Sequence, residues 1–490
     1  MGWKEAAEPV LTRMPSVARP EGHVPFRRKL GWTAGILVLY FFLTNVTLFG
    51  LATGSEDFFG QFRSILAGSQ GSILQLGIGP IVTASIVLQL LGGADLLGLD
   101  TSDPRDQILY QGLQKLLVVV MIVLTGLPMV FAGNFLPADP AVAQSLGVGS
   151  NSVKGLIFAQ IAVGGILILF MDEVVSKWGV GSGVGLFIIA GVSQQLVAGL
   201  FSWEALGRTS GFFPTWFGII TGSTELPSVL TAEGLQALFL GQGQILALIT
   251  TLLIFGIVVY AESVRVEIPL SHARVKGARG RFPVKLIYAS VLPMILVRAL
   301  QANIQFLGRI LDSQLGSLPV WLGQYNANGQ VTGGLFYFLA PIQTRADWMW
   351  FLGLTSNEPW EIMIRILVDL TFMIIGGAIF AIFWVETTGM GPEATARQIQ
   401  NSGMQIPGFR RNPQVIEKVM ERYIPQVTVI GGALVGLLAV AANMLGTIGQ
   451  VSGTGLLLTV SITYKLYEEI AEEQLMEMHP MMRQMFGGGN

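Results

Sequence analysis

Ionisable residues inside apolar stretches are the first candidates for chemistry in this sequence. Arg298, Arg365 and Asp369 each lie within a long apolar stretch, and the last two are four positions apart, on one face of a helix. Charged residues in such surroundings mark ion or proton pathways, or pair with one another. Because no pair of carboxylates lies near the middle of a stretch, the pattern favours a structural ion pair with snorkelling side chains over a proton relay.

The groups needed for hydrolysis or metal binding are missing from these stretches. The three histidines, His23, His272 and His479, all fall in polar segments, and the chain has no cysteine. The glycine-rich segment 179–185 resembles a phosphate-binding loop, but no strand is expected before it, so close helix packing is favoured. Neither a Ser–His pair nor a pair of intramembrane aspartates is present. The sequence therefore indicates no enzyme activity, no metal site and no cofactor.

Aliphatic pairs at helical spacing are the more informative pattern. Ile78 and Val82 are four positions apart. Val184 and Ile188 repeat this spacing at the end of the glycine-rich segment 179–185, the second glycine cluster of the chain. The first pair is interrupted by the sequence Gly-Ile-Gly-Pro at 77–80. Proline removes a backbone donor and glycine permits irregular geometry or close approach. We interpret this stretch as a functional break rather than an ordinary kink.

The composition identifies the kind of environment that these residues occupy. Only 12% of the residues are charged and 51% are hydrophobic, against roughly 25% charged in soluble domains. The chain is therefore an integral membrane protein. A net charge of −2 gives no indication of a nucleic-acid partner. The first 25 residues are polar and broken by proline, unlike a cleavable signal peptide.

Ten segments are long enough to cross an apolar core of about 30 Å. An even number places both termini on one side of the membrane. Most of the 29 Lys and Arg residues fall in the termini and loops of that side, which the positive-inside rule makes cytoplasmic. The predicted spans are 30–51, 73–92, 109–131, 153–171, 184–201, 243–262, 284–307, 362–385, 425–446 and 450–468.

The spans divide the chain into two halves of five. We predict an N-terminal half at 1–201, an outer connecting loop at 202–242, a C-terminal half at 243–470 and a cytoplasmic tail at 471–490. Because each half has an odd number of spans, a repeat relating them must be inverted in topology. The predicted fold class is an all-α polytopic membrane protein with two inverted five-helix halves around a central pore.

A short segment before the second span is too polar and too short to cross the membrane. Residues 54–67 carry apolar side chains on one helical face, with Arg63 and other polar residues on the opposite face. We predict a re-entrant helix that meets the following span. Since irregular backbone at membrane depth needs protein or water around it, a pore should lie at this junction. The apolar face consists of Phe58, Phe59, Phe62, Ile65 and Leu66.

Several motifs in the same order resemble the SecY family, the alpha subunit of the Sec protein-conducting channel (preprotein translocase) in its archaeal and eukaryotic form. The resemblance covers nearly the whole chain. It is strongest in LGIGPIVTASIVLQLL (76–91), VGSGVGLFIIAGVSQ (180–194), RVEIPLSHARVKG (265–277), IPGFRRNPQVIEKVMERYIP (406–425) and GTGLLLTVSITYKLYEE (453–469).

The resemblance implies a function for the pattern of aliphatic pairs. In such a channel, 54–67 would be a plug that closes the outer funnel, and six aliphatic side chains would form a ring at the waist. We call these six the aliphatic ring. Aliphatic side chains exclude ions by dewetting and can yield to any translocating polypeptide. The ring residues would be Ile78, Val82, Val184, Ile188, Ile295 and Leu458.

The resemblance also implies a lateral gate and a set of partners. The gate would release apolar segments into lipid, with polar residues at Thr83 and Asn303, and with Thr125 where several relatives carry an acid. The partners would be SecE (gamma), a small beta subunit, signal sequences and nascent chains, membrane lipid, and a translating ribosome docked on two basic loops. The ribosome-binding residues would be Arg274, Lys276, Arg279, Arg281, Arg410 and Arg411.

Two other classes of protein remain as alternatives. A secondary transporter of a small solute would also allow ten spans and inverted halves, but it requires an ion-coupling residue near the midplane, and none is found. An intramembrane hydrolase requires the catalytic constellation that is missing above. We expect a passive channel in the cell membrane with both termini cytoplasmic.

Overall fold

The computed structural model describes most of the chain, and the statements below concern that part. It describes residues 3–478 apart from 53–61, 94–96, 100–103, 133–134, 204–210, 224–230, 242, 273–278, 286–291, 327–329, 354, 356, 402–403, 406–412 and 450.

Helices dominate the architecture, as predicted. The first part of the chain forms α1 (Trp3–Leu11), α2 (Phe26–Thr44), α3 (Arg63–Leu66), α4 (Gly79–Gly93), α5 (Pro104–Phe131), α6 (Pro140–Leu146), α7 (Ser150–Trp178) and α8 (Gly183–Phe201). The connecting region contributes α9 (Phe212–Thr221) and α10 (Ala232–Phe239). The second part forms α11 (Ile245–Ser263), α12 (Leu292–Leu315), α13 (Leu335–Phe338), α14 (Pro359–Thr387), α15 (Pro392–Asn401), α16 (Pro413–Leu445) and α17 (Gly453–Met478), with short 3-10 turns η2 (Arg345–Asp347) and η3 (Trp350–Leu352).

Strands appear only as small additions within the described residues. β1 (Arg265–His272) pairs antiparallel with β2 (Arg279–Lys285), and β5 (Met404–Gln405) joins the other edge of β1. β3 (Gln324–Tyr325) and β4 (Val331–Gly333) form a separate two-stranded sheet. The β1–β2 hairpin lies in the first of the two basic loops, for which the all-α prediction included no strand.

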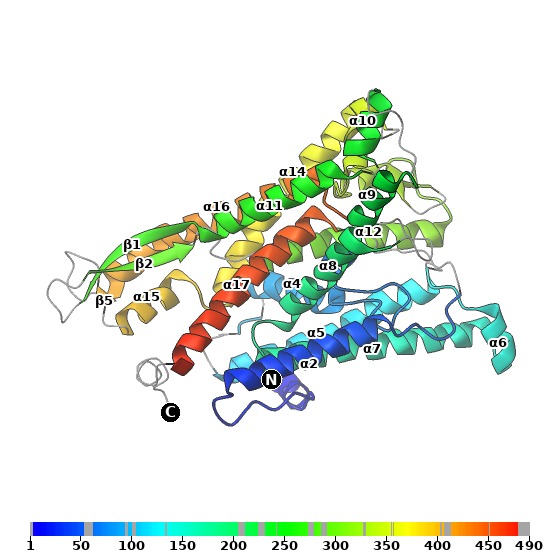
Figure 1. The fold of residues 1–490 in the computed structure, drawn as a ribbon. Coiled ribbons are helices and arrows are strands. Elements are labelled where there is room, and N and C mark those ends of the chain that lie inside the picture. Colours follow the sequence, from blue (N-terminus) through cyan, green and yellow to red (C-terminus); the bar gives the residue numbers. More distant parts are fainter. Residues whose placement is uncertain are drawn as a thin grey trace.

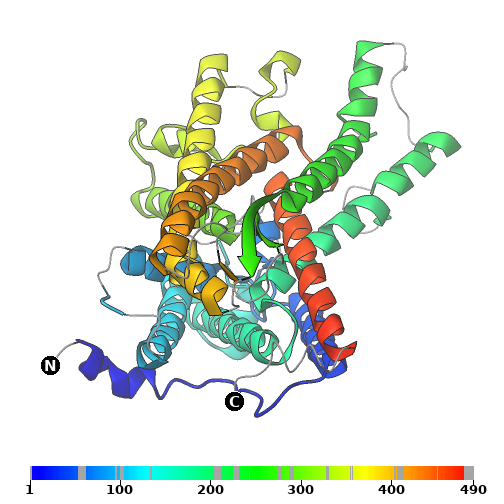
Figure 2. The same cartoon turned by 90° about the vertical axis from the view of Figure 1, so that its left-hand side faces the viewer.

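The long helices form a bundle with the hairpin at one end and α6 and α10 at the other (Figure 1). Seen from the hairpin end, the helices of the first half gather on one side and α12, α14 and α16 on the other (Figure 2). Lys29 at the start of α2 pairs with Glu473 near the end of α17. Arg265 of the hairpin pairs with Glu468, 2.9 Å away. These contacts place the start of α2, the end of α17 and the hairpin at the same end of the molecule.

Helices occupy all ten places where spans are predicted, but not all ten are typical membrane spans. Among the described residues, six helices are long and apolar enough to cross a membrane, namely α5, α7, α8, α11, α14 and α16. The other four predicted spans correspond to α2, α4, α12 and α17, which lie outside that set. The protein is therefore a multi-span membrane protein, while the count of ten spans remains a prediction.

The second predicted span begins later than expected. The sequence placed its start near Ile73, whereas α4 begins at Gly79. Residues 73–78 form turns, and Gly77 has a φ of 54°, in the left-handed region. The backbone donors that would start a helix here are used elsewhere, because the Ile78 amide donates to the Leu66 carbonyl at 2.7 Å. The irregular geometry predicted from Gly-Ile-Gly-Pro is present.

The second glycine cluster brings helices close together, as its small residues predict. A Cβ on Gly183 would lie 2.5 Å from the Cα atom of Asp172 on α7, and one on Gly185 would lie 2.9 Å from Ile462 on α17. The Asp172 carboxylate accepts a hydrogen bond from the Val184 amide at 2.9 Å. Ser182 caps the N-terminus of α8. This packing holds the start of α8, and with it Val184, against two other helices.

Candidate functional site

The six residues of the aliphatic ring lie inside the bundle. Ile78, Val82, Ile188, Ile295 and Leu458 are buried members of one hydrophobic core, and the partly buried Val184 packs against it. Ile78 directly precedes α4, Val82 lies in its first turn, and the other four lie on α8, α12 and α17. Helix α4 packs against α12, and α8 against α17. The positions that the sequence singled out therefore face protein and not the outside of the bundle.

Helix α3, the end of the predicted plug segment, lies among the same elements. It packs against α8, α12 and α17. Ile65 and Leu66 are buried, and Phe62 is partly buried against the core. The Leu66 carbonyl accepts the hydrogen bond from Ile78 described above. All four elements that carry the aliphatic ring thus meet α3, which is not on the outer surface of the bundle.

In the predicted plug segment, Arg63 is placed differently from the prediction, and part of the segment lies outside the described residues. Arg63 was assigned to a polar face with Glu56, Asp57 and Gln61, but its exposed fraction is 7%, so it turns into the protein. At this position the surrounding α8, α12 and α17 enclose both faces of a very short helix. Phe58 and Phe59 lie outside the described residues, and helix is described only at Arg63–Leu66.

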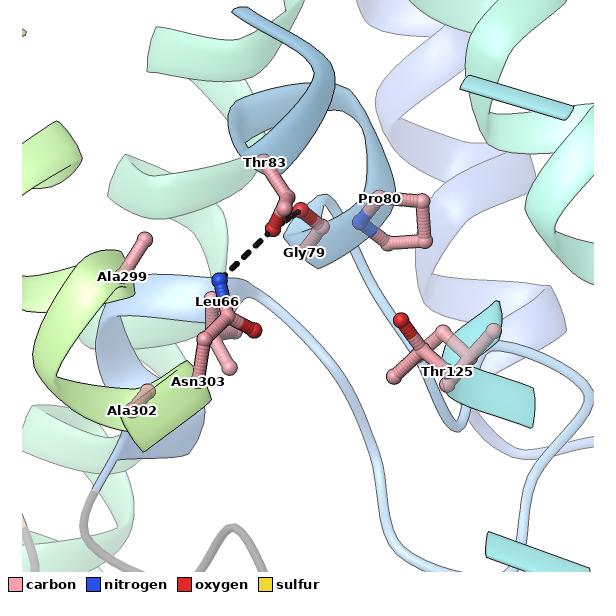
Figure 3. Close-up of a pocket in the computed structure, with 9 residues that line it drawn as sticks. Leu66, Gly79, Pro80, Thr83, Thr125, Ala299, Ala302 and Asn303 are labelled. Carbon is pink, nitrogen blue, oxygen red and sulfur yellow. Dashed lines mark hydrogen bonds between the residues drawn. The ribbon is translucent and has the colours of Figure 1, made fainter. Parts of the chain in front are cut away.

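A polar contact crosses the boundary between α4 and α12. The Asn303 Nδ2 atom donates to Thr83 Oγ1 at 3.0 Å, and that hydroxyl donates to the Gly79 carbonyl at 2.9 Å. A pocket lies beside this contact, and Figure 3 shows Thr125 on the side away from the hydrogen bond. The structure thus brings Thr83 and Asn303 together and leaves Thr125 apart from them. The pocket is lined by Leu66, Leu76, Gly79, Pro80, Thr83, Thr125, Ala299, Ala302 and Asn303.

A second contact joins the C-terminal end of α12 to the end of α5. Ser313 Oγ and Gln314 Nε2 both donate to the Ala132 carbonyl, at 3.0 and 2.7 Å. The Arg309 guanidinium lies 5.0 Å from the centre of the Phe135 ring, within cation–π range. A helix end leaves backbone carbonyls without intrahelical partners, so Ala132 is a ready acceptor. We call this set the α5–α12 clasp.

The intramembrane charges are paired differently from the sequence prediction. Arg298 on α12 contacts Asp369 on α14 at 3.0 Å, and their side chains are 1% and 0% exposed. Gln301 bridges them, because its carbonyl accepts from Arg298 at 2.7 Å and its amide donates to Asp369 at 2.9 Å. The Ile342 amide also donates to Asp369, at 3.2 Å. A structural ion pair is present, but it joins two helices and does not snorkel.

Arg365 therefore has other partners than the predicted Asp369. Its guanidinium donates to the carbonyls of Ala340 and Pro341 at 3.0 and 2.8 Å, and lies 3.6 Å from Asp347. It also lies over the Tyr337 ring, 4.9 Å from the centre. Burial raises the pKa of the Tyr337 hydroxyl. The spacing of four residues would allow an Arg365–Asp369 ion pair, but Asp369 pairs instead with Arg298 on the neighbouring helix.

The predicted ribosome-binding residues are only partly covered by the structure. Arg279 and Arg281 lie in β2. Arg274, Lys276, Arg410 and Arg411 lie outside the described residues. β5, next to the second basic loop, pairs with β1, so the described parts of the two loops adjoin one another.

Sequence reasoning missed several residues of this region. Tyr40 on α2 donates to the Ala67 carbonyl just after α3, and Gln301, Ser313 and Gln314 make the contacts described above. Tyr40 carried a usable signal, because a hydroxyl within an apolar span must find a hydrogen-bond partner. No sequence pattern pointed to the α5–α12 clasp, since polar residues are common at helix ends.

Six aliphatic side chains inside the bundle, a short helix seated among the elements that carry them and a polar contact along the α4–α12 seam are the features expected of a protein-conducting channel with a plug domain. The family model of SecY matches residues 72–467, and the model of the plug domain of Sec61p matches residues 38–71. The chain belongs to the SecY family. Membership in this family makes it a channel subunit and not an enzyme.

Individual relatives are similar to this chain over nearly its full length. A protein translocase subunit SecY from Haloferax volcanii is 84% identical, covering 99% of this chain and 100% of the relative. The one from Archaeoglobus fulgidus is 52% identical, with 98% of each chain covered.

Solved structures give the same result for the fold. One described as a protein conducting channel superposes with a TM-score of 0.78 at 38% identity, covering 96% of this chain and 98% of that one. Sec61 in a canine ribosome–channel complex from the endoplasmic reticulum gives 0.75 at 38% identity, with the same coverage.

Proposed function

We propose that this chain is the pore-forming subunit of a passive channel that moves secretory polypeptides across the cell membrane. The observation that carries the proposal is the meeting of all four ring-bearing elements with α3. In the resting state the segment ending in α3 blocks the pore. Aliphatic side chains form no hydrogen bonds with a passing chain, so the same ring seals against ions and accepts any sequence.

The two halves, 1–201 and 243–470, would move apart along a lateral gate. On one side of this gate lie α4 and α5, and on the other α12 and α14. The packing of α4 on α12 and α14 supports this assignment, as does the hydrogen bond between Thr83 and Asn303. A signal sequence would open the gate by burying its apolar stretch there, at roughly 0.8 kcal/mol per CH₂ group.

No nucleotide or metal site is proposed, so a partner must drive transport. We propose a translating ribosome on the hairpin end, with Arg274, Lys276, Arg279, Arg281, Arg410 and Arg411 contacting RNA phosphates. The canine relative in a ribosome–channel complex supports this. Both termini would be cytoplasmic, since the start of α2 and the end of α17 share the hairpin end. SecE (gamma) and a small beta subunit would complete the complex.

Cross-linking of a stalled secretory chain tests the pore directly. A photoreactive residue at Ile78 or Val184 should capture the chain, because Ile78 bonds to the end of α3 and Val184 lies on α8, which packs against α3. The same residue at Leu252, which is 64% exposed on α11, should capture lipid or other membrane components instead. Equal capture from Leu252 and Ile78, or none from Ile78, would contradict the proposed path.

Ribosome binding is tested separately by reversing one charge. The substitution Arg410→Glu should weaken binding and make the affinity depend less steeply on salt, because a phosphate contact is lost. Binding is measured by co-sedimentation over a series of salt concentrations. Arg397→Glu on α15 is the control, because Arg397 is not among the six proposed ribosome-binding residues. An unchanged affinity at every salt concentration would remove Arg410 from the docking surface.

A further inference from the structure

A tyrosine in the first apolar helix contacts the backbone at the exit of α3. Tyr40 is 1% exposed, and its hydroxyl donates to the Ala67 carbonyl at 2.9 Å. Burying a hydroxyl without a partner is costly, so this hydrogen bond stabilises one position of the α3 exit relative to others. Neither the aliphatic ring nor the lateral gate includes Tyr40.

The backbone that accepts this bond is unusually constrained. Ala67 follows α3 with φ 50° and ψ 35°, a left-handed conformation that residues other than glycine rarely adopt. The preceding carbonyl, that of Leu66, accepts from the Ile78 amide at 2.7 Å. Two consecutive carbonyls at the α3 exit are therefore held from different elements, one by α2 and the other by the residue before α4.

The phenol group of Tyr40 also contacts α8, next to a residue of the aliphatic ring. It stacks on Phe187 of α8, with the ring centres 5.1 Å apart and an angle of 20° between the planes. Phe187 directly precedes Ile188. A Cβ on Gly191 would lie 3.5 Å from the Tyr40 hydroxyl oxygen and 3.8 Å from Ala67, so α8 approaches both closely. Tyr40 thus occupies the corner between α2, α8 and the end of the plug.

We propose that Tyr40 is a positioning residue that holds the plug in its resting place through the hydrogen bond to Ala67. This inference rests on the proposed function, in which α3 leaves the pore when a polypeptide enters. Departure of α3 must break the Tyr40–Ala67 bond, while the stack on Phe187 can remain. The hydroxyl therefore sets how readily the plug is released, and the aromatic ring sets the local packing.

Replacing the hydroxyl alone separates these two contributions. The chain has no cysteine, so one introduced by Ile65→Cys at the buried end of α3 reports plug release through its rate of labelling by a water-soluble thiol reagent. With Tyr40→Phe added, labelling should become about two- to tenfold faster, the effect of losing one net hydrogen bond. An unchanged labelling rate would overturn the proposal.

Two controls distinguish plug release from general loosening. The reporter Ile122→Cys, buried in the core on α5, should label at the same rate with and without Tyr40→Phe. Tyr110→Phe, a matched substitution on α5, should leave Ile65→Cys labelling unchanged. Equal acceleration at both reporters would show that Tyr40 supports the whole fold, and would overturn the positioning role.

Failure of this inference differs from failure of the proposed function. Deletion of residues 54–67 should raise ion conductance of the resting channel if this segment is a plug. If deletion causes leakage but Tyr40→Phe leaves labelling unchanged, only the role of Tyr40 is wrong. If deletion causes no leakage, the plug assignment fails, and faster labelling then reports only a local contact.

Discussion

The junction between α3 and α4 depends on a single residue type at one position. Gly77 has a φ of 54°, and a Cβ there would lie 2.1 Å from the Leu66 carbonyl oxygen and 2.7 Å from the Gly68 amide nitrogen. Only glycine allows the backbone before α4 to approach the plug so closely. This approach is what lets the Ile78 amide bond to the plug.

The substitution Gly77→Ala should displace the end of α3 and open the resting channel to ions. The left-handed conformation and the clash together cost about 2 kcal/mol or more, enough to favour an unseated plug. Ion conductance of the channel in planar bilayers measures the effect. Gly92→Ala at the end of α4, where a Cβ meets nothing within 4 Å, is the matched control. If the resting Gly77→Ala channel conducts no more ions than the unaltered one, this account of the junction is contradicted.

At the scale of elements, α12 combines several roles along one helix. It carries Ile295 of the aliphatic ring, Arg298 of the ion pair, Asn303 at the seam, and Ser313 and Gln314 of the α5–α12 clasp. These polar residues explain why α12 is not among the helices apolar enough to be identified as spans. Arg298 and Gln301 fix α12 to α14, so these two helices should move as a unit when the gate opens.

Removing one charge from this pair should destabilise the protein strongly. Asp369→Asn leaves Arg298 buried without a counter-charge, which costs about 3–5 kcal/mol. Adding Arg298→Gln should restore part of that loss, because the buried charge is then gone. Thermal unfolding in detergent measures both. Glu393→Gln in the exposed Arg397–Glu393 pair should change stability by under about 1 kcal/mol. Equal effects of Asp369→Asn and Glu393→Gln would be inconsistent with this role.

At the scale of the molecule, two of the polar contacts between the halves lie along the predicted lateral gate, among the residues that the structure describes. They are the Thr83–Asn303 hydrogen bond and the α5–α12 clasp, and Ser313 and Gln314 are exposed. Contacts of this kind contribute about 1 kcal/mol each. Polar contacts of this strength can be broken when one apolar segment enters the gate, whereas the buried Arg298–Asp369 pair within the C-terminal half stays intact.

Loosening the clasp should therefore lower the threshold for opening. The double substitution Ser313→Ala and Gln314→Ala should allow export of a reporter whose signal sequence has been made less apolar. Export of a reporter with a full-strength signal should change little, because opening is then already favourable. Ser317→Ala, just beyond α12, serves as control. If the weakened signal is exported no better than by the unaltered channel, the clasp does not restrain the gate.

The sequence by itself determined the membrane class, the approximate places of the helices, the break at 77–80 and the two aliphatic i, i+4 pairs. These follow from local properties: hydropathy and length define an apolar helix, and glycine with proline defines a break. The SecY motifs lie in contiguous stretches, so they too could be recognised without coordinates. In the two i, i+4 pairs, Ile78, Val82 and Ile188 are buried and Val184 is partly buried, because helical spacing determines which residues share a face.

Only the tertiary structure decided which residues from different helices meet. Asp369 pairs with Arg298 and not with Arg365, because a helix packed alongside supplies a partner that spacing along one helix cannot reveal. Arg63 is buried for the same reason, since α8, α12 and α17 enclose α3. The start of α4 at Gly79 likewise depends on a carbonyl from α3 taking the Ile78 amide. Hydrogen bonding and packing between segments distant in sequence determine these features, and no local pattern encodes them.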